Sequence, residues 1–234
     1  MATLTIKPIK ILAKGAYIIG SGNLNYKIHV KAKDEIGILA DEFNRMTERL
    51  AQYQKEMEKK AKLDEQIEIA RSIQQNLIPS GGIDNDFVSI GGFYKAATGV
   101  GGDYYDFIMK NEKYGLIISD VAGKGVPASL MMTMIRTVFR SLINSGVIYP
   151  PRIVTLINNT LISDISSDRF ATLLFGIYDH KKMLFQYTNA GYGPIMLFKK
   201  SENECSLVEP KKSSIPIGVM PDVTYMEENP IRLD

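Results

Sequence analysis

An apolar seam between residues 36 and 57 constrains the fold of this chain more than any other feature. The seam steps by three and four residues and consists of Ile36, Leu39, Phe43, Met46, Leu50, Tyr53 and Met57. This heptad-like spacing predicts a long helix of the kind that forms coiled coils. The helix should begin near Asp34 and Glu35, because carboxylates are favourable at the positive end of a helix dipole.

A second seam continues the helical pattern in a different phase. It runs through Leu63, Ile67, Ala70, Gln74 and Leu77, and it begins six residues after Met57, where a heptad requires seven. Such a break locally disturbs a coiled coil. It is compatible with a surface helix that frays around its lysines, and equally with a joint that transmits rotation or a change of register. Pro79 to Gly82 should end the helix.

Residues before the first seam predict a shorter helix. Ile6, Ile9, Leu12 and Ala16 recur at helical spacing, and Pro8 suits the first turn. Glycine, serine and asparagine at positions 20–23 should end this helix, and residues 24–30 should form an extended connector.

The remainder of the chain alternates strands with two helices. Aromatic and β-branched content predicts strands at 87–97, 104–109, 114–119, 170–178, 183–188 and 195–198, with helices at 128–143 and 151–165. Strands, then helices, then strands indicate a layered α+β domain with a largely antiparallel sheet.

Composition excludes several functional classes. The net charge is +2 and no basic stripe alternates with aromatic residues, so no nucleic-acid partner is expected. One cysteine, Cys205, cannot form an internal disulfide, and with only His29 and His180 beside it a structural zinc site is not expected. No apolar run approaches the length of about 18 residues that spans a bilayer, so the chain as given should be soluble.

Two glycine-flanked acidic clusters carry the strongest chemical signal. They cover residues 100–107 and 119–127, and they place Asp103 and Asp120 at the ends of two neighbouring predicted strands. A single acid there is most often a solvated turn residue. Two such acids separated by one hairpin suit a hard divalent cation, since Mg²⁺ and Mn²⁺ prefer oxygen ligands. The spacing required for a phosphate-binding P-loop and the G-x-S-x-G nucleophile motif are both absent from the sequence.

An ordered series of motifs resembles a known enzyme family. The series is GGDYYDF (101–107), SDVAGKGVPA (119–128), FATLLFG (170–176), TNAG (188–191) and IPIG (215–218). Together these segments resemble the SpoIIE/RsbU-like branch of the metal-dependent PPM serine/threonine phosphatases over residues 66–234. The segment EIARSIQQNLIP (68–79) is similar to the helix that leads into this domain.

The amino-terminal part resembles a HAMP domain over residues 5–55. The resemblance rests on Pro8, DEIG (34–37) and FNRM (43–46). The HAMP resemblance implies a homodimeric signalling module at 1–55, followed by a coiled-coil linker at 56–80. The phosphatase resemblance implies an incomplete PPM-like domain of layered antiparallel sheets and helices at 81–234. HAMP domains usually follow a transmembrane helix, so the resemblance implies a cytoplasmic chain whose parent protein is anchored at the inner face of the bacterial membrane.

The phosphatase resemblance also implies roles for individual residues. Asp120 would bridge two Mn²⁺ or Mg²⁺ ions, the carbonyl of Val121 would complete one shell, and Asp103 would be a further ligand. The metals would activate a water for attack on phosphoserine or phosphothreonine. Asp106 would either join the site or hold its hairpin. The implied substrate is a phosphorylated anti-sigma-factor antagonist of the STAS class.

The sequence departs from the family pattern in two places. Members continue with further acidic motifs that complete the two-metal centre, so the resemblance implies truncation at the carboxyl terminus, with an exposed sheet edge and an incomplete core. Tyr192 stands where the family usually has histidine. Three functions therefore stay open. They are a sensor-linked phosphatase, a catalytically incomplete signalling module that binds the substrate protein, and a structural helical dimer with a poorly folded tail.

Overall fold

The computed structural model describes residues 2–32, 34–96, 99–110, 112–164, 169–210 and 215–233, with the side chains of residues 2–5 left aside. The chain divides into two compact units, Met1–Gln66 and Ile67–Asp234. Helix α1 (Ala2–Gly20) lies in the first unit, and the long helix α2 (Glu35–Gln75) begins there and ends in the second. The boundary therefore falls within a continuous helix.

Both helices of the first unit follow the predicted pattern, with one correction. Helix α2 starts where the acidic pair predicts, and the Asp34 carboxylate caps it by accepting hydrogen bonds from the backbone N–H of Ile36 and Gly37. The prediction that Pro8 lies in the first turn was wrong, because α1 already begins at Ala2. Pro8 is inside the helix, where its missing N–H removes one backbone hydrogen bond.

The connector between these helices is held by a small core. Ile28 is buried. Its backbone N–H donates a hydrogen bond to the Asn44 side-chain oxygen at 2.8 Å, and its carbonyl accepts one from the Asn44 side-chain nitrogen at 2.9 Å. Gly15 allows this approach, since a Cβ there would lie 2.5 Å from Ile28 Cγ1. One amide side chain of α2 thus replaces the sheet partner that an isolated extended segment lacks.

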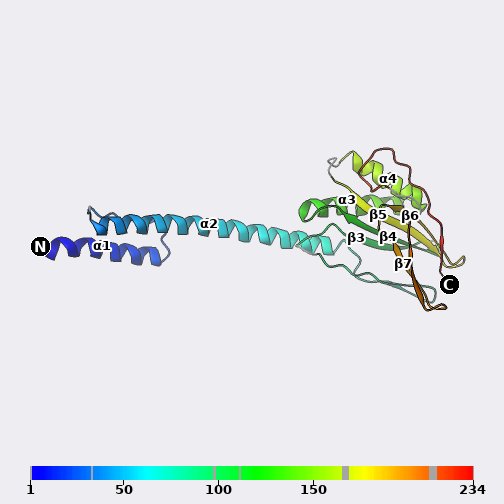
Figure 1. Cartoon of the computed structure of the whole chain (residues 1–234), viewed down its shortest axis with the longest axis horizontal. Helices are drawn as coiled ribbons and strands as arrows, with labels where there is room; N and C mark the ends of the chain where they lie inside the picture. Colours follow the sequence, from blue (N-terminus) through cyan, green and yellow to red (C-terminus); the bar gives the residue numbers. More distant parts are fainter. Residues whose placement is uncertain are drawn as a thin grey trace. The chain divides into compact units, whose positions relative to one another are not determined.

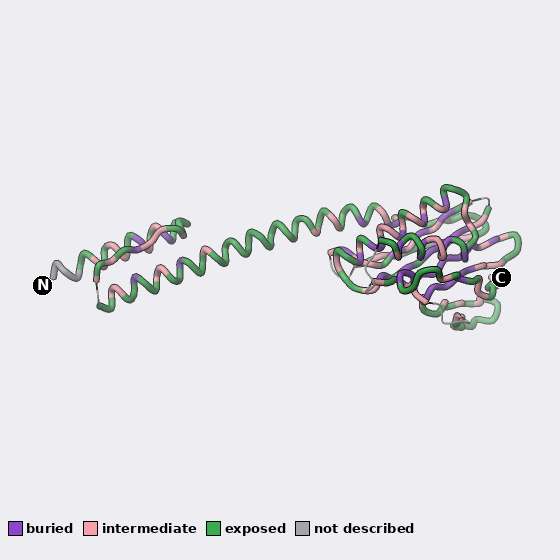
Figure 2. Tube along the Cα trace, turned by 90° about the horizontal axis from the view of Figure 1, so that it is seen from above, coloured by how far each residue is buried: buried purple, intermediate pink, exposed green. Residues whose placement is uncertain are grey.

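The middle of α2 is exposed along its whole circumference. All residues from 52 to 66 are exposed, which Figure 2 shows as an unbroken green stretch. Tyr53, Met57 and Leu63, which belong to the predicted seams, are each more than half exposed. The helix continues without interruption through the phase break. An apolar stripe that the described part of the chain leaves exposed is what a helix that pairs with a second helix presents.

A five-stranded antiparallel sheet organises the second unit (Figure 1). Its order is β3 (Tyr104–Lys110), β4 (Lys113–Val121), β5 (Ala171–Asp179), β6 (Leu184–Ala190) and β9 (Ile231–Arg232). Two-stranded sheets are formed by β1 (Ile83–Asp84) with β2 (Ser89–Ile90), and by β7 (Ile195–Lys199) with β8 (Glu204–Val208). Helices α3 (Val126–Asn144) and α4 (Pro150–Ile162) complete the described elements.

The two faces of the five-stranded sheet are covered differently. Helices α3 and α4 pack on one face and enclose the main core, which is centred on fully buried Met132, Phe139 and Phe175. On the opposite face a smaller cluster joins Leu174 and Tyr187 to the β7–β8 hairpin. A folded layered α+β domain is the result, as the sequence predicts. The hypothesis of a poorly folded tail was therefore wrong.

Some predicted strands differ from the observed ones. The strand expected at 87–97 was wrong in extent, because only Ser89 and Ile90 form a ladder in the described part of that segment. The preceding Asn85 side chain accepts hydrogen bonds from the N–H groups of Phe87 and Val88, so these residues form a turn. Strands β1, β8 and β9 were not predicted. Position 165, the predicted end of α4, lies outside the described residues.

One helix in the described part of the chain has the length and apolar composition to cross a membrane, namely α3. Its residues Met131, Met132, Ile135 and Phe139 are buried in the core of the second unit. Helix α3 is therefore the central helix of this domain, which explains its apolar composition.

Candidate metal and phosphate site

A pocket of about 580 Å³ brings the two acidic clusters together at one end of the sheet. Its described lining includes Asp103 before β3, Asp120 near the end of β4, Thr172 of β5, Tyr192 after β6, and Tyr94 with Lys95 from the preceding loop. A larger hollow, about 710 Å³, lies elsewhere and is lined mainly by apolar residues without any acid. Of these two, the smaller pocket combines convergent polar groups with charge, so it is the candidate functional site.

Strand alternation places Asp120 in this pocket. Its neighbours Ser119 and Val121 are buried, Val121 in the core beneath α3 and α4, whereas Asp120 is exposed, as expected because successive side chains of a strand point to opposite faces. Asp120 pairs with Thr172 of β5, and both residues line the pocket. The hairpin of β3 and β4 then brings Asp103 beside it, because Tyr104 is in register with Ser119.

The two carboxylates interact directly. Pocket walls partly shield the Asp103 carboxyl group from water although the residue is exposed overall, and this desolvation is the largest cause that raises its pKa. A hydrogen bond to Asp120 and the Asp120 charge raise the same pKa further. Two acids that share a site disfavour double ionisation, and a divalent cation between them would compensate the repulsion.

The backbone near Val121 is also close to the acids. A Cβ on Gly102 would lie 3.0 Å from the Val121 carbonyl oxygen and 3.1 Å from the Ala128 Cβ, so only glycine fits comfortably between them. Gly123 and Gly125 follow with φ of 106° and 71°, a left-handed conformation that favours glycine. The chain can therefore turn sharply from β4 into α3, with the Val121 carbonyl close to Gly102, the residue that precedes Asp103.

These donors fit a hard cation. Two carboxylates and one backbone carbonyl are oxygen ligands of the kind that Mg²⁺ and Mn²⁺ prefer. Within the described ranges no group of three or more histidine, cysteine, aspartate or glutamate side chains gathers as a metal site. Protein ligands of this set would leave much of the coordination shell to water and to substrate oxygens, as is usual for Mg²⁺.

Tyr192 forms one wall of the pocket in a fixed position. The Asn189 side chain accepts a hydrogen bond from the Tyr192 N–H at 2.7 Å and donates one to its carbonyl at 3.1 Å. Burial raises the pKa of the Tyr192 phenol, and the charges of Asp103 and Asp120 raise it further. The tyrosine that replaces the family histidine therefore remains neutral and close to the acids.

Asp106 has a different role from its neighbour Asp103. It is buried and faces α3, where it accepts a bidentate pair from the Nε and Nη2 of Arg140, and a hydrogen bond from the Tyr104 hydroxyl at 2.7 Å. Burial, followed by the charge of Asp106 and this hydrogen bond, raises the pKa of Tyr104. Asp106 joins the sheet to a helix and does not line the pocket.

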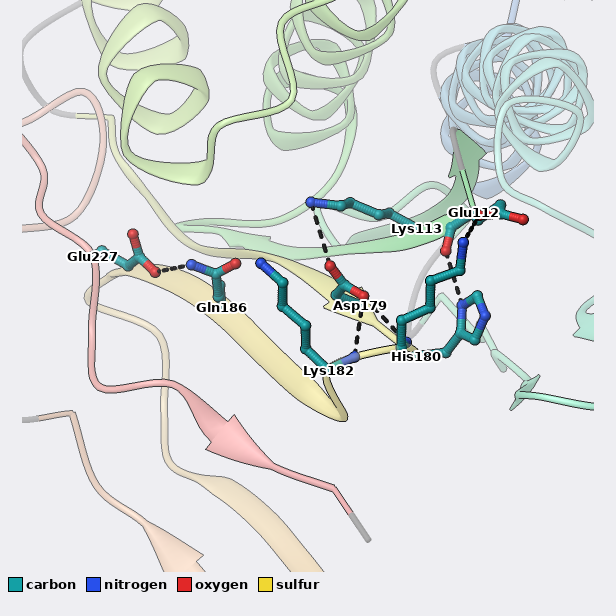
Figure 3. A network of polar contacts seen from close by, with 8 residues as sticks. Glu112, Lys113, Asp179, His180, Lys182, Gln186 and Glu227 are labelled. Atoms are coloured by element: carbon teal, nitrogen blue, oxygen red, sulfur yellow. Dashed lines mark hydrogen bonds and ion pairs between the residues drawn. The ribbon is translucent and has the colours of Figure 1, made fainter.

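A second polar cluster lies at the other end of β4 and β5 (Figure 3). Asp179 accepts hydrogen bonds from the backbone N–H groups of Lys181 and Lys182. It also forms an ion pair with Lys113 at 3.5 Å. Desolvation raises the pKa of Asp179, but these backbone bonds and the Lys113 charge outweigh it and lower the pKa. The carboxylate is thus satisfied by the turn that it stabilises.

His180 belongs to the same cluster. Its Nδ1 lies 3.0 Å from the Glu112 carbonyl oxygen, and its ring stacks on Phe87. The cluster therefore holds two hairpin ends together and leaves the acidic pocket as the better candidate site.

Two residues near the pocket were not singled out by the sequence. Lys95 is the only lysine or arginine among the described residues that line it. Gln74 of α2 is buried and hydrogen-bonded to Gly101, two residues before Asp103. A signal for Gln74 was present, because a polar residue in an apolar helical seam requires buried partners.

Two protein-family models match the chain. The family model for Stage II sporulation protein E (SpoIIE) matches residues 110–233, just over half of the chain. The HAMP domain model matches residues 1–52.

Two curated relatives and one solved structure are similar to the chain. "Phosphoserine phosphatase RsbU" of Bacillus subtilis is 31% identical over 126 residues, which cover 54% of this chain and 37% of that protein. "Protein IcfG" of Synechocystis sp. is 29% identical over 254 residues, covering 93% of this chain and 39% of that protein. The SiaA-PP2C domain of Pseudomonas aeruginosa superposes with a TM-score of 0.59 at 19% identity, over 75% of this chain and 69% of that one, and shows the shared fold. The chain thus spans under two fifths of the length of these curated relatives.

Proposed function

Because the chain belongs to the SpoIIE family of PPM-type phosphoserine phosphatases, we propose that its acidic pocket hydrolyses phosphoserine or phosphothreonine in a partner protein. The observation that carries this proposal is the meeting of Asp103 and Asp120 in one pocket at the sheet end. Enzymes of the PPM family are metal-dependent, and the oxygen donors of this pocket suit Mn²⁺ or Mg²⁺. Asp103, Asp120 and the Val121 carbonyl would hold the metal.

Each wall of the pocket has a role in this proposal. A divalent cation in such a site supplies Lewis acidity and a water of lowered pKa. Asp103 and Asp120 set its place. Lys95 attracts the phosphoryl oxygens, because an ammonium group favours a negatively charged substrate group. Tyr192 borders the same space with a neutral hydroxyl that can donate a hydrogen bond to a phosphoryl oxygen.

The accessibility of the acids supports a protein substrate. Asp103 and Asp120 are both exposed residues, so a phosphorylated side chain on the surface of another protein can reach them. We propose a phosphorylated anti-sigma-factor antagonist of the STAS class, following the family resemblance. The HAMP match and the exposed seam of α2 support a homodimer paired through HAMP and linker helices, within a membrane-anchored parent protein.

Release of phosphate from a phosphoserine-bearing STAS protein tests the proposal. The full-length protein is incubated with the substrate and increasing Mn²⁺ or Mg²⁺, with EDTA as the metal-free control. We expect hydrolysis that rises with metal concentration and stops with EDTA. Failure at every metal concentration would contradict the proposal. If the phosphoprotein still bound under those conditions, the catalytically incomplete signalling module would be the better description.

A further inference from the structure

A single buried side chain joins helix α2 to the loop that carries Asp103. Gln74, in the last turn of α2, is only 3% exposed. Its Nε2 donates to the Gly101 carbonyl at 2.7 Å and to the Ser129 hydroxyl at 2.8 Å. Its Oε1 accepts from the Gly101 N–H at 3.0 Å and from the Tyr94 hydroxyl at 3.3 Å. Both donor hydrogens and both acceptor lone pairs of the amide are therefore used.

The loop held in this way is also closely packed on both sides. A Cβ on Gly101 would lie 2.4 Å from the Tyr94 hydroxyl oxygen, and a Cβ on Gly102 would lie 3.0 Å from the Val121 carbonyl oxygen. The backbone from Val100 to Gly102 is thus confined between the Gln74–Tyr94 pair and the end of β4. Asp103 follows directly, so the position of its carboxylate depends on this confinement.

The same side chain reaches the helix that begins beside the pocket. Ser129 lies in the first turn of α3 and donates its N–H to the Gly125 carbonyl at 3.1 Å. Gln74 therefore contacts both segments that flank the proposed metal site, the loop before β3 and the start of α3. A purely space-filling residue would need neither contact, since apolar side chains satisfy a core position without hydrogen bonds.

From these contacts we propose that Gln74 is a positioning residue for the metal site. It fixes Gly101 and Ser129 at once, so that the Asp103 carboxylate and the Val121 carbonyl stay at the separation a cation requires. Partners that orient metal ligands typically contribute about 10- to 100-fold to metal affinity or activity. The proposal rests on the proposed phosphatase function, because it assigns the metal to this pocket.

Substitution of Gln74 by methionine tests the role, with Gln75→Met as the matched control. Methionine keeps the volume and removes all four hydrogen bonds, whereas Gln75 is its exposed neighbour on the same helix turn. Mn²⁺ binding to the full-length protein is measured by calorimetric titration, together with the Mn²⁺ concentration that half-activates hydrolysis. For Gln74→Met we expect the Mn²⁺ dissociation constant and the half-activating Mn²⁺ concentration each to rise about 10- to 100-fold. Gln75→Met and wild type should agree within about twofold by the same reasoning.

A second pair of variants separates positioning from stability. Gln74→Glu keeps the shape and the two acceptor contacts but loses both donors. It should therefore also raise the Mn²⁺ dissociation constant and the half-activating Mn²⁺ concentration. Ser129→Ala removes one partner and leaves both bonds to Gly101, so its shift should be smaller. KM for the phosphoprotein should stay unchanged in all variants at saturating Mn²⁺, because Gln74 does not line the substrate pocket.

The outcomes distinguish the two proposals. If the wild-type protein bound no Mn²⁺, the proposed function itself would fail. If wild type bound Mn²⁺ and both Gln74 variants bound it equally well, while only their melting temperature fell, Gln74 would be a structural residue and the inference would be overturned.

Discussion

Replacement of Asp120 by asparagine should lower kcat/KM for the phosphoprotein at least about a thousandfold, which corresponds to about 4 kcal/mol of transition-state stabilisation. Asparagine keeps the shape of the side chain but removes the charge that holds a cation beside Asp103. The effect should appear mainly in kcat, because Asp120 contributes to the proposed metal site rather than to recognition of the surrounding protein. Initial rates of phosphate release at saturating Mn²⁺ give the value.

Stability measurements distinguish this loss from unfolding. Asp120 is exposed and repels Asp103, so removal of its charge should leave the melting temperature within about 2 °C of wild type or raise it slightly. Asp84→Asn is the matched control, since Asp84 is an exposed acid of strand β1 outside the pocket. Full activity of Asp120→Asn would show that the pocket is not the catalytic site.

Replacement of Arg140 by alanine should destabilise the second unit by about 3 kcal/mol, because it leaves the charge of the buried Asp106 carboxylate uncompensated. The Asp106 side chain is fully buried, and Arg140 supplies two of its hydrogen bonds. For a domain of this size the melting temperature should fall by about 6 to 12 °C. Denaturant or thermal unfolding followed by circular dichroism measures the change.

A double variant identifies the cause of that destabilisation. Asp106→Asn in the Arg140→Ala background removes the uncompensated charge, so it should recover part of the lost stability. Arg152→Ala is the control, since Arg152 is an exposed arginine of α4 and its removal should cost about 0.5 kcal/mol or less. An Arg140→Ala protein as stable as wild type would contradict a structural role for the pair.

Sequence patterns with strong periodicity predicted their elements well. The seam from Ile36 to Met57 lies on one continuous helix, and the apolar content of residues 128–143 coincides with α3. Alternation in β4 is equally clear, since Ile117, Ser119 and Val121 are all buried. Helix α3 and strand β4 bury apolar surface against the large core, which fixes their pattern. The seam of α2 is largely exposed, and its helical period alone identifies the element.

Other elements lacked such a signal. Strand β8 is exposed at Glu204 to Leu207, so no alternation between core and solvent marks it. Strand β9 has only two residues and pairs with β6, which is more than forty residues earlier in the chain. Short strands that depend on distant partners cannot be recognised from local propensity.

The candidate site was predictable in part, because some of its residues lie in motifs that are close together in the sequence. Adjacent strand ends brought Asp103 and Asp120 together, which glycine-flanked motifs suggested without any long-range information. Strand alternation could also have shown that Asp106 and Asp120 point to opposite faces of the sheet. It could not have shown that Arg140 is the partner of Asp106. The place of Gln74 in an apolar seam indicates a buried amide, but no periodic pattern encodes its partner, a loop 27 residues away.

The most direct test of the account is the location of bound manganese. Crystals of the full-length protein grown with Mn²⁺ are measured at the manganese absorption edge, and an anomalous difference map is calculated. We expect a peak between the carboxylates of Asp103 and Asp120 and close to the Val121 carbonyl, at ligand distances of about 2.0 to 2.3 Å. An ordered pocket that contains no anomalous peak, with manganese bound only elsewhere, would contradict the assignment of this pocket as the metal site of a phosphatase.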